Sequence, residues 1–245
     1  MSRVDLIPVE GLPEVGPGDD LADLISRRAK FRPGDVLVVA QKIVSKSEGR
    51  VVDLGGVKAG QAAKEIAPRL VAAPDPRMVQ VVLDQSVRVL RDERALITET
   101  RHGFVAANAG VDHSNVPGDE SVTLLPLDPD ASARGLRQRL RELTEVDVGV
   151  IISDTFGRPW RLGIVNVALG VAGVRAVLDL RGQEDDAGKR LHATVLAVAD
   201  EVAAAAGLVM GKTSRTPAVI VRGLDLKGDG AGRDLVRPAA EDLFR

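Results

Sequence analysis

The sequence predicts a mixed α/β fold, an irregular α+β arrangement with short buried strands rather than a regular doubly wound sheet. Three observations support this prediction. Hydrophobic residues make up 44% of the 245 residues, which is enough for a sizeable core. Several short β-branched runs are bounded by Gly, Pro or Asp, as buried strands tend to be. Strand-like and helix-like segments alternate, but without the regular βαβ period of a doubly wound fold.

Five short apolar runs have the pattern of buried strands. They cover residues 5–9, 36–40, 104–109, 148–153 and 218–221. Four longer segments favour helices, at residues 20–30, 59–70, 131–142 and 192–208. Asp20 is a candidate cap of the first helix, and Pro129 and Asp130 precede the third. The fourth helix is rich in Ala, with Val195, Val198 and Val202 at a spacing that predicts one buried face.

The segments between these elements resemble loops rather than linkers. Residues 72–77 and 116–119 have loop composition, and neither segment is long enough to connect separate domains. We therefore expect residues 1–245 to form a single unit. Two interleaved lobes within it stay open as an alternative, with boundaries that the sequence does not assign.

Composition and charge exclude several function classes. The 33 Lys and Arg residues nearly balance the 35 Asp and Glu residues, and aromatic residues make up only 2%. The chain therefore lacks the positive field and the stacking residues typical of nucleic-acid binding. The absence of Cys excludes disulfides, thiol nucleophiles and iron–sulfur clusters. The sequence contains no targeting segment and no apolar run long enough to cross a bilayer, so the cytoplasm is the expected location.

Gly211-Lys212-Thr213 resembles the end of a phosphate-binding P-loop, but the context differs. That motif needs a Gly five positions before its second Gly, and residue 206 is Ala. A predicted helix leads into the segment and a predicted strand follows it, which is the reverse of the P-loop order. The sequence favours a helix C-terminus capped by Gly211, while a contact with nucleotide in another geometry stays open.

Two polar clusters follow predicted strands. In residues 35–50, Lys42, Lys46 and Arg50 are spaced four apart, so a helix there would place three cations on one face. They could bind a polyphosphate or a carboxylate, or simply form a solvated face. In residues 108–115, Asp112 and Asn115 offer oxygen ligands to a hard cation such as Mg²⁺, or form an Asx turn.

The third cluster, in residues 148–163, carries the most information. An uninterrupted apolar strand leads to Asp154 and Thr155, and ligands bind at such strand ends in open α/β sheets. Gly157 would allow a tight turn, and Arg158 and Arg161 flank the single Trp. Carboxylate and hydroxyl oxygens suit a metal, and guanidinium groups suit phosphate or carboxylate. The alternative is a capping Asp–Thr pair with surface arginines.

Together, residues 41–50, 108–116 and 153–161 resemble the γ-glutamyl ligase family of coenzyme F-420, a deazaflavin. Residues 10–14 and 221–223 fit as well, so the similarity spans the chain in the right order. The resemblance implies an enzyme that adds L-glutamate in γ-linkage to the coenzyme precursor and hydrolyses GTP to GDP and phosphate. It also implies Mg²⁺ or Mn²⁺ as cofactor, a homodimer and an unusual mixed α/β fold.

The resemblance further implies roles for individual residues. Asp112, Asp154 and Thr155 match metal ligands. The positions that match contacts to GTP are Leu12, Pro13, Glu14, Val15, Gln41, Lys42, Lys46, Asn115 and the loop of residues 210–217, with Met210, Gly211, Lys212 and Thr213.

These residues support a mechanism of carboxylate activation. The carboxylate of the precursor would attack the γ-phosphate of GTP, and glutamate would capture the acyl phosphate. We assign Asp154 to the metal, Lys46 to the phosphates, and Arg158 or Arg161 to a substrate carboxylate. The competing hypotheses are a metal-dependent small-molecule kinase or NTP hydrolase that forms no amide, and a non-catalytic nucleotide sensor.

Overall fold

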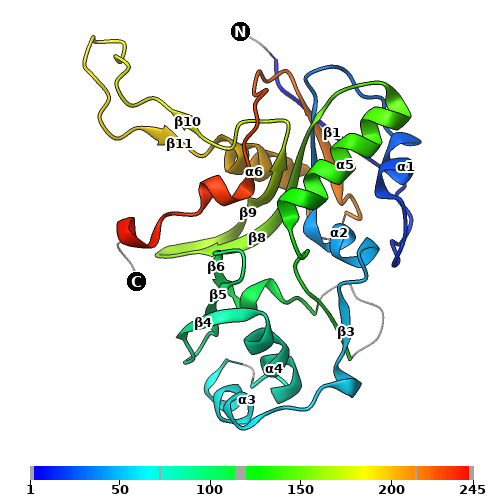
Figure 1. Ribbon diagram of the computed structural model, residues 1–245, viewed down its shortest axis with the longest axis vertical. Helices are drawn as coiled ribbons and strands as arrows, with labels where there is room; N and C mark the ends of the chain where they lie inside the picture. The colour runs from blue at the N-terminus through cyan, green and yellow to red at the C-terminus, as the bar shows by residue number, and fades with distance from the viewer. Residues whose placement is uncertain (1–2, 72, 114–119, 213, 243–245) are drawn as a thin grey trace.

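A computed structural model describes residues 3–71, 73–113, 120–212 and 214–242, and it has two lobes (Figure 1). The first and last described segments belong to the large lobe, which contains a five-stranded sheet. The described residues between 51 and 123 leave this sheet and form the small lobe at the bottom of the view. The prediction of a mixed and irregular α/β fold is confirmed.

The sheet of the large lobe has the strand order β1-β12-β2-β8-β9. The strands are β1 (Asp5–Pro8), β12 (Ala218–Arg222), β2 (Val36–Ala40), β8 (Gly149–Arg158) and β9 (Arg161–Ala172). Strands β2 and β8 are parallel, whereas the other neighbouring pairs in this sheet are antiparallel. Ala40 lies opposite Ser153 in the parallel pair, so the residues that follow them emerge side by side.

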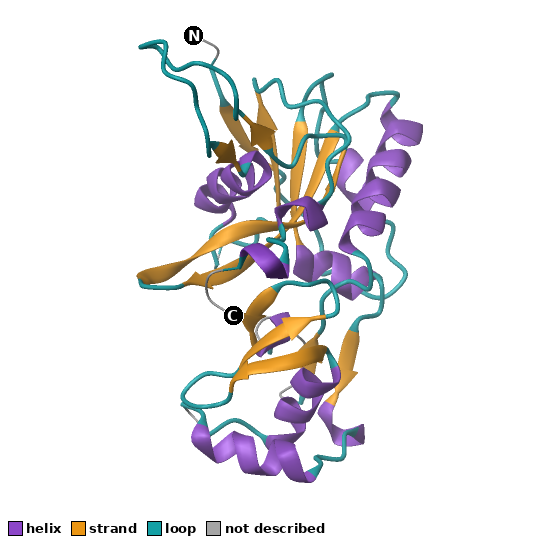
Figure 2. Ribbon diagram, turned by 60° about the vertical axis from the view of Figure 1, so that its left-hand side comes forward, coloured by secondary structure: helices purple, strands orange, loops and turns teal. Residues whose placement is uncertain are grey.

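Helices cover both faces of this sheet (Figure 2). The helices of the large lobe are α1 (Leu21–Ser26), α2 (Gln41–Ser47), α5 (Pro129–Thr144) and α6 (Val198–Met210). Leu37 and Val39 of β2 pack in the core beneath α1 and α5, whereas Val36 and Val38 pack beneath α6. This alternation explains why β2 is apolar throughout, since both of its faces are buried.

Strands β8 and β9 continue beyond the sheet as a two-stranded ribbon. Pairing of β8 with β2 stops at Ser153, but its pairing with β9 continues to Arg158. The predicted strand end at residue 153 and the predicted turn at Gly157 are therefore wrong. Gly157 pairs with Ile164 inside the ribbon, and the chain reverses at Trp160, which has a φ of 58°.

The small lobe packs two helices against short strands. Its elements are β3 (Val51–Asp53), α3 (Gln61–Ile66), α4 (Pro76–Asp84), β4 (Ser86–Arg91), β5 (Ile97–Thr100), β6 (Val105–Ala107) and β7 (Ser121–Thr123). Strands β4, β5 and β6 form an antiparallel sheet, and β3 pairs with β7. A separate apolar core, which includes Leu54, Ile66 and Leu96, stabilises this lobe.

A projecting arm and short 3₁₀ turns complete the described chain. Strands β10 (Leu178–Asp179) and β11 (Val195–Leu196) form the base of the arm (Figure 1). The 3₁₀ turns are Leu54–Gly56, Ala67–Arg69, Asn108–Gly110, Gly232–Leu235 and Ala239–Glu241. Within the described ranges, none of the helices is both long and apolar enough to cross a membrane.

Several element boundaries differ from the prediction for identifiable reasons. The helix predicted at residues 192–208 begins only at Val198, because residues 195–196 pair with β10. The loop predicted at residues 72–77 ends early, because Asp75 caps α4 and Pro76 opens it. The strand predicted at residues 104–109 covers only β6, since Asn108 and Ala109 have positive φ. The predicted loop at residues 116–119 lies outside the described residues.

Asp20 connects the two helices on one face of the sheet. Its carboxylate accepts a 3.0 Å bond from the backbone N–H of Asp23 and another from Arg139 of α5. We expect Asp20→Ala to lower the free energy of unfolding by about 1 kcal/mol, because α1 loses its cap. Urea denaturation measures this change. Asp20→Asn, which retains a capping oxygen, should lose clearly less, and equal losses in the two variants would contradict the capping role.

Candidate active site

A cavity of about 890 Å³ lies where β2 and β8 leave the sheet. Its lining comes from the loop before α1, from α2, from the β8–β9 ribbon and from the segment after α6, with Asp112 added by the small lobe. The predicted site residues in this lining are Leu12, Pro13, Glu14, Val15, Gln41, Lys42, Lys46, Asp112, Asp154, Thr155, Met210, Gly211 and Lys212. Asn115 and Thr213, also predicted, lie outside the described residues.

The two predicted carboxylate ligands reach the cavity from different lobes. Asp154 follows Ser153 at the point where β8 loses its pairing with β2. Asp112 pairs with Thr123 in an isolated bridge of the small lobe, directly after a turn that ends at Gly110. Gly110 has a φ of 70°, and a Cβ atom there would lie 2.7 Å from Leu125. This turn therefore requires glycine to direct the chain toward the cavity.

The electrostatics of Asp154 reflect this convergence. Burial raises the pKa of Asp154 to about 6, above its ordinary value of 3.8. A hydrogen bond from the backbone N–H of Thr155 counteracts this rise, and the nearby charge of Asp112 adds to it. The charges of Lys212 and Lys42 also lower the pKa. Two carboxylates are thus close enough to repel each other, an arrangement that a bound cation would stabilise.

Three lysines surround the carboxylates, and each contacts an oxygen of the site. Lys42 lies 2.8 Å from a carboxylate oxygen of Asp112, and Lys46 forms an ion pair with Glu14. Lys212 donates a 2.8 Å bond to the hydroxyl of Thr155. Lys46 is only 6% exposed, so its charge is directed into the protein rather than into solvent. The solvated-face alternative is therefore wrong for Lys42 and Lys46.

Arg50, the third cation of the predicted helical face, has a different role. Helix α2 ends at Ser47, so the spacing of four no longer places Arg50 beside the two lysines. Its guanidinium group donates instead to the carbonyl oxygen of Leu125 and to the side chain of Gln85. Arg50 thus connects the segments that enter and leave the small lobe.

Two amide side chains in the cavity lining, those of Gln41 and Asn166, have N–H groups with weak or missing hydrogen-bond partners. Gln41 is 1% exposed, and its Oε1 accepts a bond from Ser45. Its Nε2 has no hydrogen-bond partner among the residues that the structure describes. The Nδ2 of Asn166 has only long contacts, 3.5 Å to Ser153 and 3.6 Å to Met210. These donors are available to a polar ligand in the cavity.

Comparison with known proteins places this arrangement in a family. The model of the F420-0:Gamma-glutamyl ligase family matches residues 11–223. The chain belongs to this family. It is 48% identical to the coenzyme F420:L-glutamate ligase of Archaeoglobus fulgidus, with 99% of this chain and 97% of the relative covered. The enzymes of the same name from Methanopyrus kandleri and Methanothermobacter thermautotrophicus are each 46% identical, with 99% of this chain and 97% and 99% of the relative covered.

Arg158, which was predicted to bind a substrate carboxylate, does not line the cavity. It lies near the tip of the β8–β9 ribbon, where its guanidinium group donates a 2.8 Å bond to the carbonyl oxygen of Leu162. Arg161 and Trp160 are exposed at the same tip. The described guanidinium group in the cavity lining belongs instead to Arg215, which follows the loop that caps α6.

Two polar residues of the cavity, Arg215 and Asn166, were not predicted from the sequence. Arg215 falls within residues 210–217, so the resemblance included its segment but not its side chain. Asn166 interrupts an apolar stretch of β9 directly opposite Thr155. An amide in an otherwise apolar strand is the signal that could have revealed it, because a buried polar group needs a partner. Gly207 faces it from α6, where a Cβ atom would lie 2.9 Å from Asn166.

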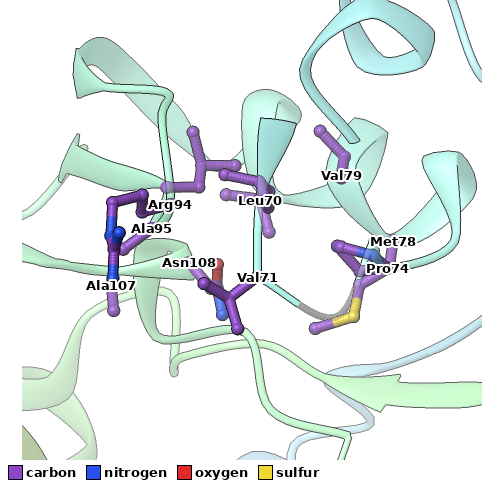
Figure 3. A pocket seen from close by; sticks show the side chains of 11 residues that line it. Leu70, Val71, Pro74, Met78, Val79, Arg94, Ala95, Ala107 and Asn108 are labelled. Atoms are coloured by element: carbon purple, nitrogen blue, oxygen red, sulfur yellow. The ribbon is translucent and has the colours of Figure 1, made fainter. Parts of the chain in front are cut away.

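A second cavity lies in the small lobe of this ligase family member (Figure 3). It has a volume of about 220 Å³ and a mostly apolar lining, which includes Leu70, Met78, Val79 and Leu96. Among its described lining residues, Arg94 carries the one charged side chain. None of the predicted site residues lines it. The predicted site residues that line a described cavity therefore all belong to the larger one.

The donors in the larger cavity suit a hard divalent cation. The carboxylates of Asp112 and Asp154 and the hydroxyl of Thr155 are the oxygen ligands that Mg²⁺ and Mn²⁺ prefer. Within the described part of the chain, no group of three or more His, Cys, Asp or Glu side chains could hold a metal. A cation bound here would therefore take several ligands from water and phosphate, as Mg²⁺ commonly does.

Proposed function

We propose that this protein joins L-glutamate in γ-linkage to the precursor of coenzyme F-420 and hydrolyses GTP to GDP and phosphate in the process. The observation that carries the proposal is the convergence of Asp112 and Asp154 in one cavity with Lys42, Lys46 and Lys212. Membership of the ligase family supports glutamate ligation as the reaction. The cavity volume of about 890 Å³ is suitable for a nucleotide-sized ligand.

The proposed reaction has two chemical steps. A carboxylate oxygen of the precursor forms a bond to the γ-phosphorus of GTP, and the bond from that phosphorus to the bridging oxygen breaks to release GDP. The amine of glutamate then attacks the carbonyl carbon of the acyl phosphate. Inorganic phosphate leaves, and the nitrogen loses a proton to form the amide. Activation is needed because a free carboxylate is a poor electrophile.

The lysines of the cavity can neutralise the charge that moves during phosphoryl transfer. Positioning and charge stabilisation account for most of the catalysis in such reactions. Lys46 is the strongest candidate, because its stem is buried and its ammonium group already binds the carboxylate of Glu14. A phosphate of GTP would compete with Glu14 for this ammonium group. The loop of residues 12–15 would consequently rearrange its contacts when nucleotide binds.

Asp112 and Asp154, with Thr155 as an additional oxygen ligand, are the residues proposed to hold Mg²⁺ or Mn²⁺. When bound, such a cation polarises phosphoryl oxygens and offsets their negative charge. Other polar side chains of the cavity can bind the remaining substrates. Asn166 and Gln41 present amide donors, and the guanidinium group of Arg215 could bind a carboxylate of glutamate or of the precursor. A clamp by Arg158 or Arg161, neither of which lines the cavity, remains a prediction, as do the homodimer and the cytoplasmic location.

A mass-resolved ligation assay tests the proposed function. The protein is incubated with precursor, L-glutamate, GTP and Mg²⁺ or Mn²⁺, and the products are separated by mass spectrometry. We expect the precursor to gain one or more glutamyl residues, with GDP formed only when both substrates are present. A phosphorylated precursor, or GDP without any amide, would instead indicate a kinase or an NTP hydrolase. Nucleotide binding without turnover would indicate a sensor.

A further inference from the structure

The alternation of side chains along β8 separates the predicted metal ligands into two groups. Val150 and Ile152 pack in the core beneath α1 and α5, whereas Ile151 packs beneath α6. Continuing this alternation places Asp154 on the face of Ile152 and Thr155 on the face of Ile151. The strand therefore presents a carboxylate on one side and a hydroxyl on the other.

The contacts of the two residues differ, although the charge of Lys212 also lowers the pKa of Asp154. Asp154 is close enough to the second carboxylate, Asp112, to feel its charge, and the ammonium group of Lys42 lies 2.8 Å from Asp112. Thr155 has Asn166 as its cross-strand neighbour, and its hydroxyl oxygen lies 2.8 Å from the Nζ of Lys212. The acidic residues in the described cavity lining are Glu14, Asp112 and Asp154, and Glu14 binds Lys46.

The position of Lys212 follows from the end of α6. Gly211 ends the helix with a φ of 55°, which turns the chain toward the ribbon. Lys212 is an exposed residue, and its side chain reaches across to Thr155 of β8. A hydroxyl oxygen has two acceptor lone pairs, so this contact leaves one for another donor or ligand.

We propose that Lys212 is a built-in cation of the nucleotide site, which takes the place of a second divalent ion beside Thr155. Two-metal sites stabilise phosphoryl transfer by positive charge on both sides of the reacting group. Here a carboxylate pair can hold one divalent ion, and a fixed ammonium group supplies positive charge beside the Thr155 hydroxyl. The inference rests on the proposed function, since it assumes that phosphate enters this cavity.

The proposal predicts the number of divalent ions that the protein binds. Manganese EPR and equilibrium dialysis, with a saturating non-hydrolysable GTP analogue, count bound Mn²⁺ per chain. We expect one ion for the unaltered protein. Lys212→Glu replaces the ammonium group by a carboxylate next to the Thr155 hydroxyl, and it should bind two. Lys212→Met removes the charge without adding a ligand, so it should bind one ion and hold the analogue about tenfold more weakly.

Lys64→Met is the matched control, because Lys64 is an exposed lysine of α3 that does not line the cavity. It should keep one Mn²⁺ and the original affinity for the analogue. Two ions in the unaltered protein, one ion in Lys212→Glu, or unchanged affinity in Lys212→Met would each overturn the inference. Absence of both Mn²⁺ and analogue binding in the unaltered protein would instead contradict the proposed nucleotide site. Circular dichroism verifies that every variant is folded.

Discussion

Replacing Asp154 by Asn is expected to reduce ligation by at least about a hundredfold at saturating Mg²⁺, while the protein remains folded. Asn has nearly the same shape but lacks the negative charge that a divalent cation requires from this position. The measurement is the rate of glutamyl product formation by mass spectrometry, with Mg²⁺ and Mn²⁺ titrated separately. An activity close to that of the unaltered protein at saturating metal would contradict the assignment of Asp154.

The same substitution should make the metal-free protein more stable at pH 7, which separates a functional role from a structural one. Burial raises the pKa of Asp154 to about 6 in the folded state, above the ordinary value of 3.8. The folded protein therefore binds this proton more tightly, and its stability falls as pH rises from about 4 to about 6. Asp154→Asn should remove this pH dependence and add about 1–3 kcal/mol at pH 7.

Urea denaturation in the presence of EDTA, at pH 4.5 and pH 7, measures this change. Loss of stability at pH 7 in Asp154→Asn would mean that the carboxylate supports the fold. Cation binding should show the opposite dependence on pH, because the cation competes with the proton. The affinity for Mn²⁺ should fall as pH decreases below about 6.

Lys46→Ala is expected to raise the GTP concentration needed for half-maximal ligation by about tenfold to a hundredfold. The ammonium group is largely desolvated, and a charge-assisted bond to phosphate at such a position contributes about 1.5–3 kcal/mol. The measurement is a GTP titration of the ligation rate, with glutamate and precursor held saturating.

Glu14→Gln is an informative companion to Lys46→Ala. It removes the charge that binds Lys46 while it leaves the ammonium group in place, so the GTP requirement should stay the same or fall. An unchanged GTP dependence in Lys46→Ala would contradict the role of Lys46. A rise in Glu14→Gln as large as that in Lys46→Ala would show that the ion pair itself supports the site.

The sequence predicts the chemical components of the site better than their positions. Asp112 and Asp154 were recognisable because each follows an apolar segment, but their convergence depends on the small lobe, which is inserted in the sequence between the segments of the large one. The turn at Gly110 and the parallel pairing of β2 with β8 create that convergence. Neither feature has a local sequence signal that specifies its partner in space.

The incorrect predictions involve segments whose partners are distant or whose patterns are mixed. Gly157 was expected in a turn, because a Gly among polar residues is typical of one, yet pairing with Ile164 keeps it in a strand. That pairing extends the ribbon and carries Arg158 away from the cavity. Strands β4 and β5 were not predicted, because their sequences mix charged, partly exposed residues with apolar ones and contain no apolar run. Tertiary pairing decided the structure in both cases.

Anomalous diffraction at the manganese edge, from crystals grown with Mn²⁺ and GDP, tests the central claim most directly. The account predicts a manganese peak at about 2.1 Å from carboxylate oxygens of both Asp112 and Asp154. It also predicts GDP phosphates within hydrogen-bond distance of Lys46. Nucleotide bound elsewhere, or a manganese ion that contacts neither aspartate, would contradict it.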